Sequence, residues 1–297
     1  YGTQGSDNRV SFGIGNFGVV FNIKPYTKNK SGVLKNFNFG FGLNRQNDFN
    51  NSVVIHGLNN ENSMMQSYAN TMNSEKIPPS AFDFTSPGYR PDLAFDLGLA
   101  FGTNLVFYDS ITKKYYCDAA YGGVIQDKII LTYGSMNEFD IAFGANFNDK
   151  FFVGMTVGIP TINYYESSSY SEADARDTIP YFAAMNYRYD LHTRGTGVNA
   201  KFGLIYKPVN WFRIGASIHT PTWYPSMRDE WYSSMSSIFD SALVNTIQSS
   251  PVGTYDYRLT TPFRAMGSLA FIIGQYGLIS ADYEYVNYSQ ARFNTTY

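Results

Sequence analysis

The chain has 297 residues, with 22 lysines and arginines against 24 aspartates and glutamates, a net charge of −2 and one cysteine. This balance gives no electrostatic reason to bind nucleic acid, and one cysteine excludes a disulfide within the chain and a thiolate zinc site. Aromatic residues make up 18% of the sequence, which excludes a disordered chain. No apolar run reaches the roughly 18 residues of a membrane-spanning helix.

The first informative segment alternates strictly between apolar residues and small or polar residues. From Phe37 to Leu43 every odd residue is large and apolar, and every even residue is glycine or asparagine. A strand with this pattern has one apolar face and one small polar face. Similar alternation follows in chain order at 138–147, 151–159, 212–219, 263–271 and 279–285. The chain is therefore predicted to be all-β.

We predict about eight or nine strands in a single domain that covers residues 1–297. In chain order they are 9–23, 36–49, 129–147, 151–165, 196–207, 211–223, 255–273 and 278–288, with 129–133 merging into 138–147. Several are longer than the usual five or six residues of soluble strands and suit a tilted strand that crosses a bilayer.

The connections between these strands alternate between short and long. Short turns stand at 148–150, 208–210 and 274–277, whereas the segments at about 57–122, 166–194 and 226–253 are long. Aromatic residues crowd the strand ends, as at Tyr164, Trp223 and Tyr288. These features are typical of a transmembrane antiparallel β-barrel with long outer loops. A soluble β-sandwich, whose strands also alternate, is the alternative.

The first predicted strand changes register in its middle. Apolar residues stand at even positions up to Ile14 and at odd positions from Phe17, so Gly15 and Asn16 form a bulge or a hairpin turn. The stretch also matches G-x-G-x-x-G. A strand and not a helix follows it, so we expect no dinucleotide site there.

Three stretches carry a family resemblance. They read NEFDIAFGANFNDKFFVG and IPTINY within 137–164, IYKPVNWFRIGASIHTPT at 205–222, and YRLTTPFRAMGSLA and SADYEY within 257–285. In their order and turn spacing, these stretches resemble adjacent strand pairs of the FadL/TodX outer-membrane transporters. The resemblance covers most of the chain.

The resemblance implies a 14-stranded barrel in the outer membrane of a Gram-negative bacterium, in contact with the lipid bilayer and lipopolysaccharide. Such a barrel captures long-chain fatty acids or other hydrophobic molecules in its extracellular loops and releases them sideways beside a kinked strand, for which Gly15 and Asn16 are the gate candidates. No hatch or Asn-Pro-Ala motif precedes residue 9, and too few strands are present. We therefore expect an internal portion of a longer protein.

A second hypothesis is a non-transporting barrel that acts as a structural or accessory subunit. In that case exposed aromatic residues of the loops, such as Phe95, Phe101 and Trp231, would dock other outer-membrane proteins. A transporter needs an apolar path from the loops to the barrel interior, whereas a scaffold does not.

The long loops contain apolar residues at helical spacing. We predict a helix capped by Ser234 that carries Met235, Ile238, Phe239, Ala242, Leu243 and Ile247, a helix from Pro91-Asp92, and one with Met64, Tyr68 and Met72. The candidate groove for an apolar ligand is formed by Leu97, Phe101, Ile238, Phe239, Leu243 and Ile247. Alternatively, these stripes only pack the loops together as an extracellular cap.

Strand parity places several charged residues on the inner face of the barrel. Arg213, His219 and Arg264 are the candidates for holding a ligand headgroup, and Arg264 is favoured because an arginine can bind a carboxylate through two hydrogen bonds. The alternative is that they only line a polar lumen and pair across strands.

The sequence does not indicate an enzyme. Ser217 and His219 share a face, but no carboxylate stands in an obvious relation to them, and G-x-S-x-G, HExxH, P-loop and EF-hand motifs are absent. Cys117 is expected to be passive. We expect no catalytic residues, no metal site and no cofactor.

Overall fold

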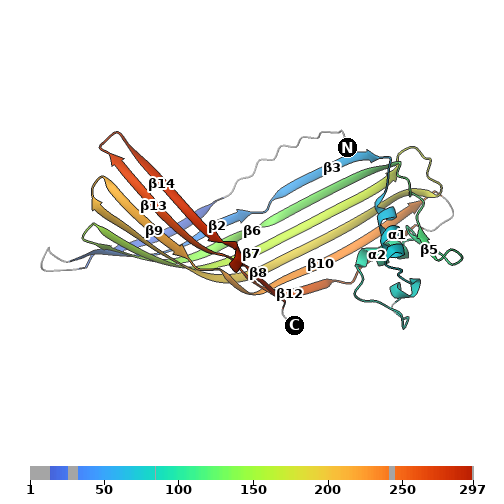
Figure 1. The fold of residues 1–297 in the computed structure, drawn as a ribbon, viewed down its shortest axis with the longest axis horizontal. Coiled ribbons are helices and arrows are strands. Elements are labelled where there is room, and N and C mark those ends of the chain that lie inside the picture. Colours follow the sequence, from blue (N-terminus) through green and yellow to red (C-terminus); the bar gives the residue numbers. More distant parts are fainter. Residues whose placement is uncertain (1–13, 26–32, 84, 241–244, 296–297) are drawn as a thin grey trace.

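The computed structural model describes residues 14–25, 33–83, 85–240 and 245–295. Most of these residues belong to one antiparallel β-sheet that curls strongly into a half-barrel (Figure 1). A compact group of helices lies against one end of this sheet (Figure 1). The all-β prediction is therefore confirmed at the level of a curled antiparallel sheet.

The large sheet holds thirteen of the described strands. They are β1 (Asn16–Ile23), β2 (Leu34–Asp48), β3 (Asn51–Asn59), β6 (Val124–Phe147), β7 (Phe151–Asp174), β8 (Phe182–Val209), β9 (Phe212–His219), β10 (Trp223–Phe239), β11 (Thr246–Ser249), β12 (Gly253–Thr260), β13 (Phe263–Ile273), β14 (Gly277–Asn287) and β15 (Arg292–Thr295). Two short strands, β4 (Phe107–Asp109) and β5 (Lys114–Tyr116), form a separate hairpin. The helical segments are α1 (Met64–Ser74), η1 (Pro79–Phe82), α2 (Phe95–Gly102) and η2 (Tyr288–Gln290).

The three central strands run the full length of the sheet, while their neighbours are interrupted at about the same level. β9 pairs with the C-terminal end of β8, and β10 pairs with its N-terminal part. The next two strands are divided in the same way, because β13 pairs with β9 and β12 pairs with β10. Pro221 and Pro262 stand in the gaps of these strands, and proline cannot donate a ladder hydrogen bond. We call the two resulting parts the cap half, which contains β3, β10, β11, β12 and β15, and the trough half, which contains β1, β2, β9, β13 and β14.

The segment predicted as a long loop at 166–194 is mostly strand. β7 continues to Asp174 and β8 begins at Phe182, so only 175–181 connects them. Asp177 and Tyr181 have positive φ in this turn. The loop prediction was wrong because the outer face here carries serine and charged residues, so the apolar alternation that marks the other strands is missing. The predicted strand 255–273 is likewise split, because β12 ends before Pro262.

The predicted helix at 234–247 is also wrong. β10 runs through Phe239 and pairs with β8 and with β11. Met235 and Phe239 stand four residues apart, a spacing that places two residues on one face of a helix and also on one face of a strand. The intervening Ser237 is buried on the same face, which fits only a strand.

The polarity of the two sheet faces is inverted between the two halves, and β8 shows this along one chain. Its pairing with β7 keeps one register throughout, so even residues point to one face and odd residues to the other. On the outer face the residues of the cap half are polar and those of the trough half apolar, in the order Asn186, Arg188, Asp190, His192, Arg194, Thr196, Val198, Ala200, Phe202, Leu204 and Tyr206. On the inner face the order reverses, from Met185, Tyr187, Tyr189 and Leu191 to Gly195, Gly197, Asn199, Lys201 and Gly203.

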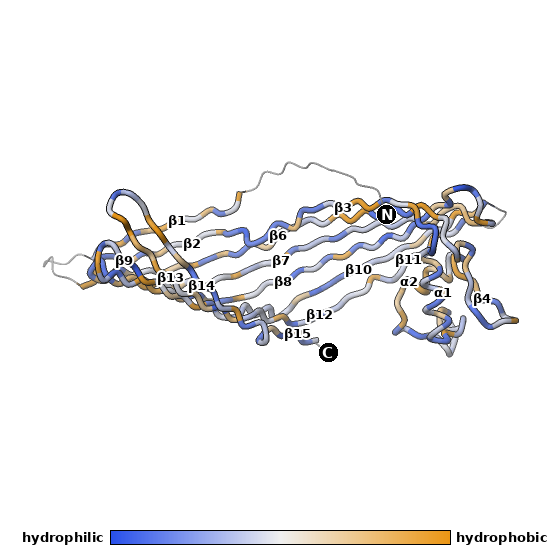
Figure 2. The backbone as a smooth tube through the Cα atoms, turned by 45° about the horizontal axis from the view of Figure 1, so that its top comes forward, coloured by the Kyte–Doolittle hydropathy of each residue, from blue (hydrophilic) through white to orange (hydrophobic). Residues whose placement is uncertain are grey.

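Aromatic rings mark the boundary between these outer regions. Tyr133, Tyr165 and His192 stack across β6, β7 and β8, with ring centroids 4.7 and 4.0 Å apart. Several apolar residues on the outer face of the cap half depart from the inversion: Val54, Ile129 and Leu131 on β3 and β6, and Ile238 and Ile247 on β10 and β11, keep exposed side chains. Figure 2 shows hydrophobic residues along β3. The outer face is therefore apolar in the trough half and mainly polar in the cap half.

Residues 60–83 and 85–123 form a cap over the inner face of the cap half (Figure 1). Its helices and the sheet share one core, to which the cap contributes Met65, Ala69, Met72, Leu97 and Ala100 and the sheet contributes Phe182, Met185, Met235 and Phe239. Ser63 caps α1 as its hydroxyl accepts from the Gln66 amide at 3.2 Å, and α1 confirms the helix predicted around Met64, Tyr68 and Met72. None of the helices described here is long and apolar enough to span a membrane.

Candidate functional site

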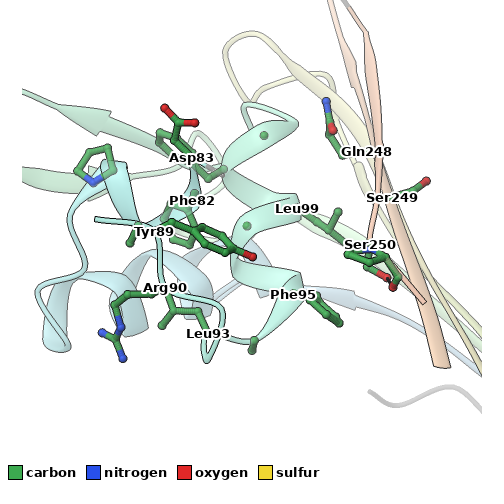
Figure 3. Close-up of a pocket in the computed structure, with 17 residues that line it drawn as sticks. Phe82, Asp83, Tyr89, Arg90, Leu93, Phe95, Leu99, Gln248, Ser249 and Ser250 are labelled. Atoms are coloured by element: carbon green, nitrogen blue, oxygen red, sulfur yellow. Dashed lines mark hydrogen bonds between the residues drawn. The ribbon is translucent and has the colours of Figure 1, made fainter. Parts of the chain in front are cut away.

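A cavity of about 330 Å³ lies between the cap and the sheet edge of the cap half. It is bounded by η1 and the following loop, by α2, and by β11 up to Pro251. Figure 3 shows α2 between these walls, with Phe95 and Leu99 directed toward Ser250 and with Phe82 and Tyr89 on the opposite side of the helix. The site therefore joins residues that are more than 140 positions apart in the sequence.

The walls of this cavity are mainly apolar and aromatic. The rings of Phe82 and Phe101 stack with centroids 5.3 Å apart, and Leu93, Phe95 and Leu99 add further carbon surface. The loop before α2 is fixed by a hydrogen bond from the Arg90 amide to the Ala81 carbonyl at 3.1 Å. Aromatic stacking and this backbone contact hold the cavity open between helix and loop.

Charge is confined to one side of the cavity. The Arg90 guanidinium contacts the Asp92 carboxylate at 2.6 Å, and both side chains are largely exposed. Asp83 also lines the site, and hydrogen bonds from the Thr85 hydroxyl and amide hold its pKa below the usual value. An apolar chamber of this size with a few polar groups at its border suits a small apolar molecule.

The structure separates the residues predicted to form the apolar groove. Phe101 lines the cavity, whereas Leu97 and Phe239 are buried in the core beneath the cap. Ile238 and Ile247 lie on the outer face of the sheet, with 49% and 71% of their surface exposed. Leu243 lies outside the described residues. The groove as predicted is therefore not formed, because 238 and 247 belong to strands whose alternation turns them away from the cap.

A second group of functional candidates lies on the inner face of the trough half. His219 on β9 stands directly opposite Lys201 on β8 and Arg264 on β13. The three side chains form a basic row, in which Lys201 pairs with Glu138 at 2.6 Å and with Asp140 at 3.4 Å. Arg264 approaches the Glu284 carboxylate at 3.8 Å. Arg213 lies six residues from His219 on the same strand and pairs with Ala270. The structure thus brings together His219 and Arg264 and leaves Arg213 apart.

Next to this row a carboxylate is completely buried. Glu138 on β6 accepts hydrogen bonds from the Asn199 amide at 2.6 Å and from the Lys201 ammonium at 2.6 Å, and from the Gln46 amide. Gly158 leaves the room for this arrangement, because a Cβ there would lie 2.2 Å from Glu138 Oε1. The contacts join three strands at the level where the sheet changes polarity.

Sequence reasoning missed Lys201, Glu138 and Arg90. The first two stand at inner positions of alternating strands, so parity alone could have selected them, but only the register reveals that Lys201 faces His219. Gly15 and Asn16 mark the start of β1, and the Gly15 carbonyl accepts from the Arg45 amide at 2.8 Å. The bulge or turn predicted there involves residues before 14, which lie outside the described residues.

No family model matches the chain, and no match is found among curated proteins or solved structures. Among the described residues, no cluster of three or more histidine, cysteine, aspartate or glutamate side chains is arranged to hold a metal ion. The functional interpretation therefore depends on the geometry of the cavity and of the two sheet faces.

Replacement of Glu138 tests the buried cluster. We expect Glu138→Ala to lower the free energy of unfolding by about 3–5 kcal/mol, because Lys201 and Asn199 lose their closest acceptor and keep only the longer contacts to Asp140 at 3.4 Å and Thr222 at 3.2 Å. The matched change Glu284→Ala removes a carboxylate that is 46% exposed and should cost about 1 kcal/mol or less. Urea unfolding in detergent micelles measures both, and equal effects would contradict a structural role for the cluster.

The single cysteine reports on the integrity of the cap. Cys117 is buried, and this burial raises the pKa of its thiol to about 12. Because an unfolded thiol ionises at about 8.5, stability contributed by Cys117 is complete below that pH and is lost as pH rises toward 12. At pH 8 we expect iodoacetamide to modify the folded protein far more slowly than the urea-unfolded protein. Equal rates would show that the cap is open.

Proposed function

We propose that this chain is part of an outer-membrane transporter that captures small hydrophobic molecules in the cap cavity and passes them through the barrel. The observation that carries the proposal is the inverted polarity of the sheet. A soluble sheet buries its apolar face under another layer. Here the apolar outer face of the trough half stays exposed, while the inner face of the cap half is buried.

The exposed apolar band has the height of a bilayer. On β6, β7 and β8 it covers 139–147, 151–159 and 198–206, nine residues on each strand. A strand tilted by about 45° crosses the hydrocarbon core with roughly 9–11 residues. The stacked rings of Tyr133, Tyr165 and His192 stand above this band, where aromatic residues mark a membrane interface. The polar cap half would then project into the layer of lipopolysaccharide.

The inner face of the trough half suits the passage of a ligand. A hollow of about 730 Å³ is lined there by Gly154, Gly203, Gly215, Ser217 and Glu284, among others. The basic row of Lys201, His219 and Arg264 lies on the same face. A hydrophobic molecule with an anionic head, such as a long-chain fatty acid, matches an apolar capture cavity followed by Arg264, whose side chain is 55% exposed and contacts Glu284 only at 3.8 Å.

A structural or accessory barrel is the alternative function. The exposed patch of Val54, Ile129 and Leu131 beyond the apolar band favours it, since such a patch can contact a partner protein. The aromatic residues proposed for docking do not support it. Phe95 and Phe101 line the cap cavity, and Trp231 packs its ring over Gly253.

The membrane position is tested on the outer face of β8. Phe202→Arg places a charge in the middle of the apolar band and should lower the free energy of unfolding from lipid vesicles by about 2–4 kcal/mol. Asn186→Arg is the matched control, because it adds the same side chain to the same face of the same strand in the polar cap half, where the change should stay within about 0.5 kcal/mol. Similar values for both would contradict insertion of the trough half.

Capture in the cap is tested by titration with the fluorescent apolar probe N-phenyl-1-naphthylamine. Leu93→Arg puts a charge against the apolar wall of the cavity and should weaken probe binding at least tenfold, about 1.4 kcal/mol. Ile111→Arg adds the same charge to a cap residue that is 90% exposed and does not line the cavity. If both variants bound the probe as tightly as the unaltered protein, the cap cavity would not be the capture site.

A further inference from the structure

α2 carries a glycine at a position where a helix disfavours it. The helix reads FDLGLAFG, and Gly98 is its fourth residue. Glycine in a helix interior costs about 1 kcal/mol relative to alanine. A short helix whose N-cap residue, Ala94, provides no side-chain hydrogen bond has little stability to lose. Gly98 therefore calls for a reason other than helix formation.

Packing and backbone geometry give no such reason. Among the described glycines, positive φ occurs at 122, 123, 134 and 274 but not at 98. A Cβ at 98 would meet only the Phe82 ring, at 3.6 Å, which is ordinary van der Waals contact. By contrast, a Cβ at Gly195 would lie 2.0 Å from the Met227 sulfur and one at Gly253 would lie 2.2 Å from the Trp231 ring. Those two glycines are fixed by packing, and Gly98 is not.

The missing side chain instead enlarges the cap cavity. Gly98 belongs to its lining, together with Leu93, Phe95 and Phe101. Any side chain there would project toward Phe82, whose stack with Phe101 forms an aromatic wall. Outside the helix backbone, the Phe82 ring is the only neighbour within 4 Å of such a Cβ. A larger side chain at 98 would therefore extend past Phe82 into the cavity.

We propose that Gly98 is the residue that determines specificity in the capture cavity, because it admits ring-bearing hydrophobic molecules against the Phe82–Phe101 wall. This inference rests on the proposed function of the cavity. A thin unbranched chain needs less width than a fused ring, so the glycine sets the upper limit on ligand width. Substitution should discriminate between ligands of different shape and should not abolish all binding.

The experiment compares two probes on the full chain in detergent micelles. We expect Gly98→Leu to weaken binding of N-phenyl-1-naphthylamine at least tenfold, and Gly98→Ala about threefold. The affinity for 1-decanol, measured by isothermal titration calorimetry, should change less than threefold in both. Asn70→Leu is the matched control, since it adds the same side chain to an exposed position of α1 away from the cavity, and both probes should bind it as they bind the unaltered protein.

A stability measurement separates specificity from structure. Gly98→Ala should raise the midpoint of thermal unfolding of the cap by about 2–4 °C, followed through the reactivity of Cys117, while it weakens binding of the ring probe. A lowered midpoint would show that the glycine is needed for packing and would overturn the proposal. The Gly98→Leu result counts only if Cys117 stays protected from iodoacetamide, which shows that the cap is folded. If Cys117 becomes reactive, the Gly98→Ala result decides whether Gly98 sets specificity.

The remaining outcomes distinguish failure of the specificity role of Gly98 from failure of the capture function of the cavity. If the unaltered protein binds the ring probe and both Gly98 variants bind it equally well, the specificity role is wrong and the capture function stands. If the unaltered protein binds neither probe, the capture function fails and the role of Gly98 fails with it. If both probes weaken equally in Gly98→Leu, position 98 blocks the cavity without selecting for width, which also overturns the proposal.

Discussion

The structure depends on the two-residue period of the β-strand, which separates apolar from polar side chains onto opposite faces of the sheet. The apolar face is the inner one in the cap half and the outer one in the trough half. One strand, β8, keeps its register with β7 over nearly its whole length, yet its outer side changes from Arg188 and Asp190 to Phe202 and Leu204. The backbone needs no bulge for this reversal, since the sequence alone exchanges the residue types. Each half then requires its own environment. The apolar inner face of the cap half is covered by the cap, and the apolar outer face of the trough half stays exposed.

The boundary between the halves is where polar groups must be buried, and the structure places its most connected polar cluster there. Glu138 lies in full burial between donors from β2 and β8, so its charge is balanced locally by Lys201. Pro221 and Pro262 interrupt the neighbouring strands at a similar level. A sheet that changes both its curvature and its polarity here gains from a cluster that fixes the register of several strands at once.

The strands of the trough half could be predicted from the sequence, whereas those of the cap half could not. Apolar residues alternate with glycine or asparagine at 37–43, and this pattern indicates a strand. At 166–194 the outer face is polar, so serine and tyrosine produce no apolar alternation. The spacing of Met235 and Phe239 satisfies both a helix and a strand. Parity placed His219 and Arg264 correctly on the inner face. The cap cavity was beyond prediction, because it depends on the contact between α2 and β11, and no local pattern encodes that contact.

The directions of the edge strands add a constraint on any closed barrel that contains this sheet. Within the described residues, the chain crosses the length of the sheet eight times from β1 to β14, when the two parts of an interrupted strand are counted as one crossing. Successive crossings alternate in direction, so β1 and β14 run antiparallel. Open edges are not tolerated in lipid, because their backbone groups lack partners. Any closed, all-antiparallel barrel that contains these eight crossings therefore holds an even number of strands.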